Sequence, residues 1–274
     1  MRLVLLTGAT GFVGRHVLRQ LSEMDLKVRL VVRENKFTHD ENYKCIESVI
    51  ATKDLFAEDS QWWANVCKGV DIIIHVAWYA EPGKYLESSR NLDCLAGTLA
   101  MAKGAAQAKV KRYIGIGSCF EYDLSKGYLP VDTPLRPLTP YAGAKAAAFL
   151  ALSQWLPAQG VEFAWCRLFY LYGEGEDSRR FVPYLRSNLE SGKIAELTSG
   201  NQIRDFLEIR EAAKMIIHVS LSQIHGPINI CSGVPITVRD FAERIADEYG
   251  RRDLLSFGTR PNNLVDPSCV VGVI

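Results

Sequence analysis

The stretch "RLVLLTGATGFVGRHV", residues 2–17, decides which fold this chain can adopt. Its apolar beginning, residues 2–7, predicts a buried strand, and the amphipathic stretch Phe12–Met24 predicts a helix. Between them lie three evenly spaced glycines, Gly8, Gly11 and Gly14. Glycines at these points allow a tight turn, a close approach of the backbone to a pyrophosphate, and close contact between helix and strand. Because a helix N-terminus attracts phosphate, the stretch predicts a dinucleotide-binding turn. A glycine-rich turn that binds nothing is the alternative.

Strands and helices alternate beyond this turn. Further apolar runs predict strands that are buried on both faces: 27–33, 71–78, 111–118 and 161–173. Residues 92–108 predict a helix between two of them. This alternation indicates an α/β protein with a Rossmann-type, doubly wound parallel sheet. After about Gly173 the pattern changes to loops, shorter strands and helices near 209–222 and 237–249. We therefore expect a Rossmann domain over 1–173 and a smaller substrate-binding lobe over 174–274, interleaved with it rather than independent.

Composition excludes several classes of function. The chain has 274 residues, and its formal net charge of +1 gives no electrostatic reason to bind nucleic acid or an anionic membrane. Its seven cysteines are scattered and form no C-x-x-C pair, so we expect neither a zinc site nor a disulfide framework. A reducing cytoplasm is the simplest location. No apolar run reaches the length of a membrane span.

The stretch "LTPYAGAKAAA", residues 138–148, predicts a helix that carries a reactive pair. Thr139 suits the N-cap and Pro140 the first helical position. Tyr141 and Lys145 then lie one turn apart on the same helix face. An ammonium group beside a phenol lowers the phenol's pKa, so Tyr141 can exchange protons near neutral pH. The alternative is an exposed pair of neighbours with no chemical role.

With these features in hand, the chain resembles the extended short-chain dehydrogenase/reductases, in particular the NAD-dependent epimerase/dehydratase family that acts on nucleotide sugars. The resemblance covers nearly the whole chain and rests on several motifs in the family's order: "TGATGFVG", "KDLF", "DIIIHVAW", "GIGSCFEY", "RLFYLYG", "IRDFLEI" and "FAERIAD". It implies that cofactor binding involves Gly8, Thr10, Gly11, Phe12, Val13, Gly14, Arg15, Arg33, Asp54, Leu55 and Ala77, together with Tyr141 and Lys145.

The resemblance also implies a catalytic set of Ser118, Tyr141 and Lys145. Tyr141 exchanges a proton with a sugar oxygen while hydride passes between that carbon and nicotinamide. Lys145 lowers the Tyr141 pKa and holds the nicotinamide ribose, and Ser118 donates a hydrogen bond to the same substrate oxygen. A strand-end serine that only caps its own backbone is the alternative for Ser118.

This sequence departs from the family pattern at two points that matter for proton transfer and substrate contact. Cys94 stands where the family often has asparagine, with Asn91 one turn earlier, so a family proton relay is in doubt. Tyr170 stands where an asparagine often contacts the sugar nucleotide. Family dehydratases carry Asp-Glu directly after the catalytic threonine.

At the two positions where family dehydratases carry Asp-Glu, this chain has Cys119 and Phe120. Neither side chain can transfer protons as a carboxyl group does. Glu121 comes one place too late, on the opposite face of a strand. We therefore expect no dehydratase activity.

The end of the second strand bears on the cofactor and on the reaction. Arg33 ends that strand and Arg15 follows the last glycine, which favours NADP(H); if Glu34 binds the ribose instead, NAD(H) is the cofactor. NADP(H) favours a ketoreductase of a nucleotide-linked 4-keto-6-deoxyhexose. The alternative is a sugar-nucleotide 4-epimerase with tightly bound NAD. Two further alternatives are a reductase of uncharged carbonyl compounds and a protein that senses NADP(H) without catalysis.

The candidate substrate residues come from several segments. Arg204 and Arg260 are candidates for the diphosphate, since a guanidinium binds phosphate oxygens through paired N–H donors. The residues expected to line the sugar pocket are Trp78, Phe120, Tyr122 and Tyr170. The family resemblance implies a homodimer formed through two helices. The chain also ends sooner than many members of the family, which suggests an abbreviated substrate lobe.

Overall fold

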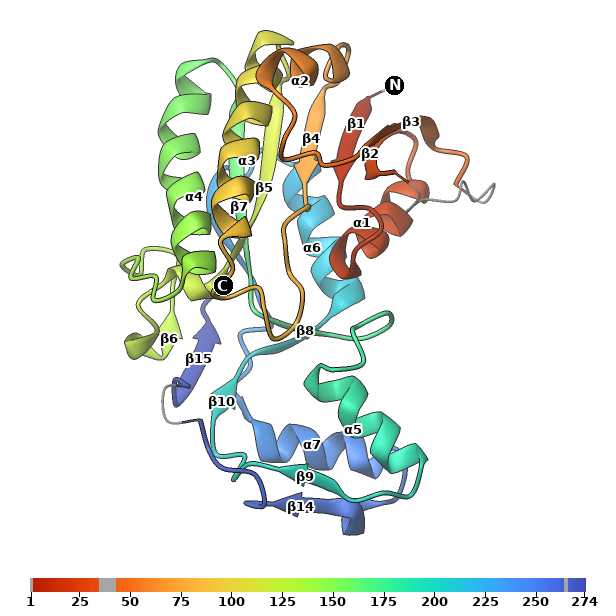
Figure 1. Cartoon of the computed structure of the whole chain (residues 1–274), viewed down its shortest axis with the longest axis vertical. Helices are drawn as coiled ribbons and strands as arrows, with labels where there is room; N and C mark the ends of the chain where they lie inside the picture. Colours follow the sequence, from red (N-terminus) through yellow and green to blue (C-terminus); the bar gives the residue numbers. More distant parts are fainter. Residues whose placement is uncertain (1, 35–42, 264–265) are drawn as a thin grey trace.

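A seven-stranded sheet forms the centre of the protein in the computed structural model, which describes residues 2–34, 43–263 and 266–274 (Figure 1). Its order is β12-β7-β5-β4-β1-β2-β3, and every pairing is parallel. The strands are β1 (Leu3–Thr7), β2 (Lys27–Arg33), β3 (Ile46–Thr52), β4 (Ile72–His75), β5 (Arg112–Ser118), β7 (Glu162–Leu168) and β12 (Gly226–Ile230). The order reverses between β1 and β4, where doubly wound sheets bind ligands. The predicted fold class is confirmed.

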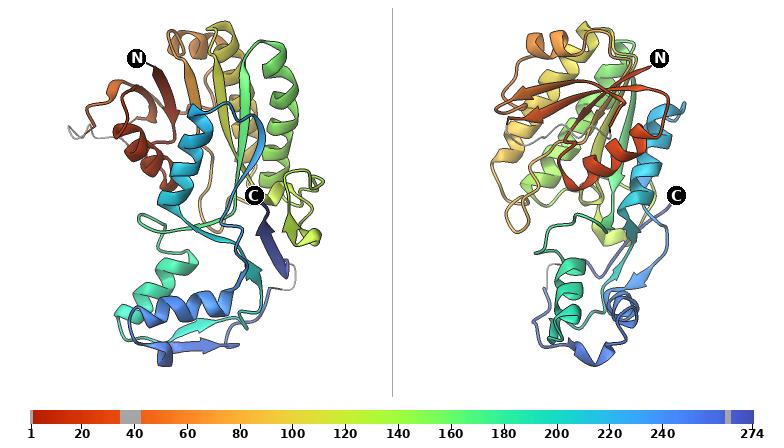
Figure 2. Two further views of the ribbon diagram at one scale, coloured as in Figure 1. Left: turned by 180° about the vertical axis from the view of Figure 1, so that it is seen from behind. Right: turned by 90° about the vertical axis from the view of Figure 1, so that its right-hand side faces the viewer.

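Helices cover both faces of this sheet, as Figures 1 and 2 show. Neighbouring side chains on β1 point to opposite faces: Leu6 joins the core under α1 and α6, and Leu5 joins the core under the other helices. Burial on both faces explains the continuous apolar runs of the central strands. The helices are α1 (Phe12–Ser22) and α6 (Ile209–Leu221) on one face, and α2 (Ser60–Val66), α3 (Arg90–Gln107) and α4 (Pro140–Ala158) on the other.

The stretch 161–173, predicted as one strand, is divided into two. β7 ends at Leu168, and β8 (Tyr170–Tyr172) leaves the central sheet to pair in parallel with β11 (Phe206–Glu208). The Tyr170 N–H donates to the carbonyl oxygen of Asp205. This partner lies far along the chain, so the local pattern could not locate the break. β3 and α2 are elements that the sequence analysis did not predict.

The remaining elements form a lobe beyond the carboxyl ends of the central strands (Figure 1). Its core packs α5 (Phe181–Glu190) and α7 (Val238–Asp247) over the β9–β14 pair. A four-stranded sheet of order β13-β10-β15-β6 joins the lobe to an earlier segment of the chain. The strands are β6 (Tyr128–Leu129), β9 (Ala195–Leu197), β10 (Ile203–Arg204), β13 (Ile236–Thr237), β14 (Leu255–Phe257) and β15 (Cys269–Gly272). Within the described residues, none of the helices combines the length and the apolar composition that a membrane crossing requires.

Helices α2 and α3 approach each other closely because α3 carries glycine at the contact. A Cβ atom on Gly104 would lie 2.7 Å from both the Ala64 nitrogen and the Ser60 carbonyl oxygen. Gly143 on α4 provides a matched helical glycine, since a Cβ there would meet nothing within 4 Å.

We expect Gly104→Ala to destabilise the fold by about 1–3 kcal/mol through overpacking. Gly143→Ala should stabilise it by about 0.5–1 kcal/mol, because alanine loses less backbone entropy in a helix. Urea unfolding of both variants measures the difference. Equal unfolding free energies for the two variants would contradict the close packing of α2 against α3.

Candidate active site

The predicted glycine turn forms a cradle at the carboxyl end of β1. Gly8 has a positive φ of 75°, and a Cβ there would lie 2.7 Å from the Ala77 nitrogen. A Cβ on Gly14 would collide with the carbonyl oxygen of Gly8. Gly11 is the N-cap of α1, and no side chain caps the N–H groups of this helix. A backbone cradle at an uncapped helix N-terminus fits a pyrophosphate, so these residues suit a dinucleotide.

Residues at and after the carboxyl ends of β2 and β3 line an open hollow of about 320 Å³. Its lining residues are Glu34, Ala51, Thr52, Lys53, Asp54, Ala57 and Glu58. Arg33 is exposed at the end of β2. Arg15 folds back on the turn and donates to the carbonyl oxygens of Gly11 and Thr10, at 3.2 and 3.3 Å. The structure therefore brings Asp54 to the hollow, while Leu55 packs on the core.

The helix that carries Tyr141 and Lys145 begins as the sequence predicts. Thr139 is the N-cap of α4 and accepts the Ala142 N–H at 3.2 Å, and Pro140 occupies the first turn. Lys145 is only 2% exposed. Its Nζ donates to the Ile116 carbonyl oxygen of β5 and lies 4.0 Å from the Trp78 ring centre. Lys145 is therefore held between β5 and an aromatic ring.

The expected effect of Lys145 on the Tyr141 pKa is not what the structure shows. Lys145 Nζ lies 5.9 Å from the Tyr141 ring centre and directs its hydrogen bond to Ile116. Burial raises the pKa of the Tyr141 phenol, and a hydrogen bond with Ser118 opposes that rise. Burial also lowers the Lys145 pKa to about 8, against the opposing charge of Glu121. Burial therefore sets the direction of both pKa shifts in this structure.

Ser118 ends β5 and faces Tyr141. Its Oγ accepts the Phe120 N–H at 3.2 Å, so the serine does cap its own backbone. A hydroxyl has two acceptor positions and one donor hydrogen, so the cap leaves the hydrogen available. The Ser118 hydroxyl opposes the rise of the Tyr141 pKa, so the two hydroxyls lie near each other. Ser118 can therefore act both as a cap and as a donor to a substrate oxygen.

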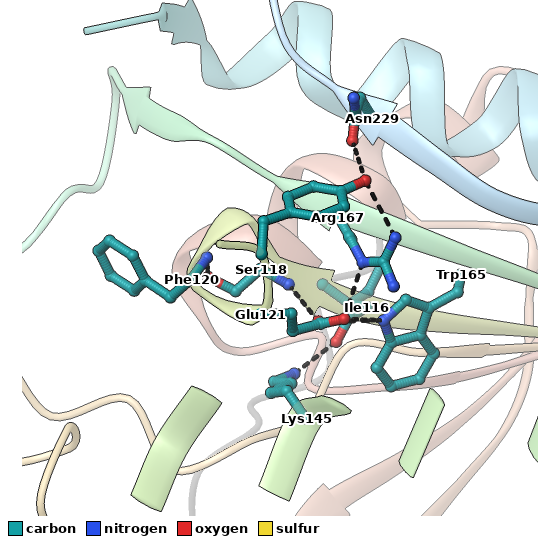
Figure 3. A network of polar contacts seen from close by, with 9 residues as sticks. Ile116, Ser118, Phe120, Glu121, Lys145, Trp165, Arg167 and Asn229 are labelled. Atoms are coloured by element: carbon teal, nitrogen blue, oxygen red, sulfur yellow. Dashed lines mark hydrogen bonds and ion pairs between the residues drawn. The ribbon is translucent and has the colours of Figure 1, made fainter. Parts of the chain in front are cut away.

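Glu121 does not lie on a strand, as the sequence analysis assumed. It occupies a short 3₁₀ turn, Cys119–Glu121, and its carboxylate turns back into the core (Figure 3). The carboxylate accepts hydrogen bonds from the Ser118 N–H at 2.7 Å, Arg167 Nε at 2.8 Å and Trp165 Nε1 at 3.1 Å. A fully buried carboxylate with these partners is unsuited to proton exchange with a substrate.

Tyr122 does not line the sugar pocket, contrary to prediction. It is fully buried, and its hydroxyl donates to Asn229 Oδ1 at 2.8 Å and accepts from Arg167 Nη1 at 2.9 Å. A single strand-end motif placed Phe120 and Tyr122 together in the sequence, but the turn sends them in different directions. Phe120 packs edge-on against Tyr170, with ring centres 6.2 Å apart.

Three predicted substrate residues form one cluster, and a fourth lies apart from them in the segment after β14. The Arg204 guanidinium is 5.2 Å from the Tyr170 ring centre, and Tyr170 contacts Phe120. Arg204 is 3% exposed and forms an ion pair of 2.7 Å with Asp266. Arg260 is exposed and instead donates to Tyr184 Oη on α5 at 3.0 Å.

The sequence analysis missed two residues beside the site: Tyr85, which packs on Tyr141, and Arg180, which packs on Tyr85. The rings of Tyr85 and Tyr141 meet edge-on with centres 4.8 Å apart, and the Arg180 guanidinium lies 5.5 Å from the Tyr85 ring centre. Asn91 supports this loop by donating to the Tyr85 carbonyl oxygen at 2.7 Å and accepting from Trp78 Nε1 at 2.9 Å. No motif marks Tyr85 or Arg180, because the contact joins two loops that are distant in sequence.

Cys94 is a small buried side chain on α3, close to Lys145. Among the described residues, no group of three or more His, Cys, Asp or Glu side chains could hold a metal ion.

Comparison with known proteins connects the chain with one enzyme family. The profile of the family described as "NAD dependent epimerase/dehydratase family" matches residues 4–231. A dTDP-6-deoxy-L-talose 4-dehydrogenase (NAD(+)) from Aggregatibacter actinomycetemcomitans is 22% identical over 98% of both chains.

Solved structures agree on the fold. The UDP-N-acetylglucosamine 4-epimerase from Methanobrevibacter ruminantium, in complex with UDP-N-acetylmuramic acid, superposes with a TM-score of 0.87 at 23% identity, covering 100% of this chain and 89% of that one. A dTDP-glucose 4,6-dehydratase from Streptomyces venezuelae with NAD bound gives a TM-score of 0.80 at 21% identity, covering 99% and 88%.

The burial of Lys145 predicts a pH dependence of stability. Its pKa is about 8 in the fold, below the ordinary value of 10.5. Between these values the unfolded chain binds more protons, so stability rises with pH. Relative to Lys145→Met, the wild type should gain about 1 kcal/mol of unfolding free energy between about pH 7 and pH 9. Urea unfolding at both pH values measures this gain. Parallel pH dependences in the two proteins would contradict the lowered pKa.

Proposed function

Because the chain belongs to the NAD-dependent epimerase/dehydratase family, we propose that it reduces the 4-keto group of a nucleotide-linked 6-deoxyhexose with a reduced nicotinamide dinucleotide. The proposal is supported by the activity for which the A. actinomycetemcomitans relative is named, the 4-dehydrogenation of a nucleotide-linked 6-deoxysugar. Reduction at C4 is the reverse of that dehydrogenation. Arg204, which lies beside Tyr170 and is paired with Asp266, is our candidate for the substrate phosphate.

One observation carries the choice against dehydration. The two side chains after Ser118 are Cys119, which is buried, and Phe120, which packs on Tyr170. The next residue, Glu121, is enclosed by three hydrogen-bond donors. Elimination of water needs a free acid and base beside the sugar. The site therefore favours hydride chemistry alone.

The roles of the catalytic residues follow from their positions. When bound, the nicotinamide ring supplies the hydride. Tyr141 gives its phenolic proton to the C4 oxygen as that oxygen gains charge. Ser118 donates a hydrogen bond to the same oxygen and stabilises the charge. Lys145, fixed by the Ile116 carbonyl oxygen and the Trp78 ring, would hold the nicotinamide ribose.

A 4-epimerase is the second candidate, and the superposition on the M. ruminantium 4-epimerase favours it. It would use the same Ser118, Tyr141 and Lys145. The two reactions differ in net cofactor consumption, because an epimerase returns the hydride to the sugar within each turnover. An assay that follows both the cofactor and the sugar product separates them.

For the cofactor we propose NADPH, because Arg33 is exposed at the end of β2, where a 2′-phosphate would lie. Three observations favour NADH: Glu34 lines the hollow beside β2, the A. actinomycetemcomitans relative is named as an NAD(+) enzyme, and NAD is present in the S. venezuelae structure. Arg15 contributes less than the sequence suggested, since its guanidinium is bonded to its own turn.

Tyr141→Phe should reduce turnover of a thymidine diphosphate 4-keto-6-deoxyhexose by about a hundredfold to ten-thousandfold, because no phenolic proton remains. Ser118→Ala should cost about a hundredfold through loss of the donor to the C4 oxygen. The matched control is Tyr128→Phe, since Tyr128 is exposed on β6. Cofactor oxidation at 340 nm measures each rate. Full activity in Tyr141→Phe would rule out the assigned proton donor.

Arg33→Ala and Glu34→Ala test the cofactor preference as a matched pair. If Arg33 binds the 2′-phosphate, Arg33→Ala weakens NADPH binding by about tenfold or more and leaves NADH binding unchanged. A tenfold loss corresponds to about 1.4 kcal/mol of binding free energy. Glu34→Ala should not weaken NADPH. Fluorescence titration with both cofactors measures the four constants. A loss of NADH binding in Glu34→Ala, with NADPH unaffected by Arg33→Ala, would assign NADH.

We also propose that a second copy of the chain packs on α3 and α4. Leu92 on α3 and Leu150 on α4 are 65% and 57% exposed, and both helices cover the same face of the sheet. Exposed apolar side chains on neighbouring helices suit a helical interface. Sedimentation should give the mass of a dimer, and Leu150→Glu should shift it toward the monomer. A wild-type monomer would contradict the proposal.

A further inference from the structure

The end of β5 is held from several sides by neighbouring elements. Lys145 on α4 binds the Ile116 carbonyl oxygen, and Glu121 accepts the Ser118 N–H at 2.7 Å (Figure 3). Between these two points lies Gly117. A Cβ on Gly117 would collide with Trp165 Nε1 and with Glu121 Oε1. The carboxylate can therefore reach the backbone of Ser118 only because β5 carries glycine there.

The Glu121 carboxylate has a second set of partners on β7. Trp165 and Arg167 lie two residues apart on that strand, so their side chains point to the same face. Both donate hydrogen bonds to the Glu121 carboxylate. Glu121 and Arg167 are 0% and 1% exposed. Removing two charges from water is costly, and a buried ion pair is weak evidence for stability. The arrangement calls for another explanation, and the Ser118 N–H is the contact that links it to the site.

The network also extends to the chain beyond the central sheet. Arg167 donates to the Tyr122 hydroxyl, which donates to Asn229 on β12. Asn229 Nδ2 donates to the carbonyl oxygens of Leu129 and Val273, at 2.8 and 3.0 Å. These contacts fix Glu121 relative to β5, β7 and β12 at once. A carboxylate fixed in this way gives the Ser118 N–H a hydrogen-bond acceptor in a fixed position.

We propose that Glu121 is a positioning residue for the reaction proposed above: by accepting the Ser118 N–H, it holds the Ser118 hydroxyl in line with Tyr141. Glu121 contacts neither the cofactor nor the sugar. It acts through the backbone of Ser118, whose Oγ then accepts the Phe120 N–H and keeps its hydrogen for the substrate oxygen. A misplacement of about 1 Å in such a group costs about a hundredfold in rate.

Two double variants separate position from stability. The Gln/Met protein carries Glu121→Gln with Arg167→Met, and the Leu/Met protein carries Glu121→Leu with Arg167→Met. Each double variant removes the buried ion pair, a replacement that proteins often tolerate. Only glutamine keeps an oxygen that accepts the Ser118 N–H. We expect the Gln/Met protein to keep kcat within a few-fold of the wild type. The Leu/Met protein should lose about tenfold or more in kcat, with the cofactor KM unchanged in both.

Hydrogen exchange of the Ser118 amide is the second readout, and it needs no substrate. The amide should exchange faster in the Leu/Met protein than in the Gln/Met protein, whatever reaction the enzyme performs. A wild type without ketoreductase activity would therefore overturn the proposed function while the exchange still tests Glu121. Equal exchange and equal kcat in the two double variants, or kcat that simply follows the melting temperature, would overturn the positioning role.

Glu121→Asp provides a further test if the Leu/Met protein does not fold. It keeps the charge beside Arg167 but is too short to reach the Ser118 N–H. We expect a folded protein with lower kcat and a faster-exchanging Ser118 amide. Wild-type kcat in Glu121→Asp would overturn the proposal.

Discussion

The close approach of side chains to the bare backbone of β5 is the constraint on which the site depends. Gly115 and Gly117 leave no Cβ on one face of the strand, and the Trp165 indole fills that space. This packing lets Glu121 reach Ser118, while Lys145 reaches Ile116 from α4. The turn after β1 depends on the same feature, because a Cβ on Gly8 would collide with the backbone of Ala77 and a Cβ on Gly14 with the carbonyl group of Gly8. Missing Cβ atoms therefore shape both the cofactor cradle and the catalytic strand end.

The parts of the fold that the sequence predicted are those governed by local chemistry. Continuous apolar runs identified β1, β2, β4 and β5, and Thr139 with Pro140 identified the start of α4. β3 was not predicted because it is an edge strand whose residues alternate between exposed and partly buried, so it lacks a continuous apolar run. The break between β7 and β8 was not predicted because it depends on the pairing of Tyr170 with Phe206, which is distant in the sequence.

Within the site, Tyr141 and Lys145 were identified from the sequence, whereas Glu121 was set aside as one place too late, and the surroundings of all three side chains were not predicted. The sequence shows that a lysine lies one turn from a tyrosine; it does not show that burial raises the phenol's pKa. The direction of Glu121 depends on a 3₁₀ turn and on Arg167, 46 residues away. Tyr122 shares that turn and became a core residue for the same reason.

The central claim is that this site reduces a sugar carbonyl and gives up its cofactor oxidised. The most direct measurement follows deuterium from nicotinamide C4 of the reduced cofactor during turnover of a nucleotide-linked 4-keto-6-deoxyhexose. The account predicts deuterium at C4 of the product sugar and one cofactor oxidised for each sugar reduced. An epimerised sugar with no net oxidation of the cofactor would contradict it.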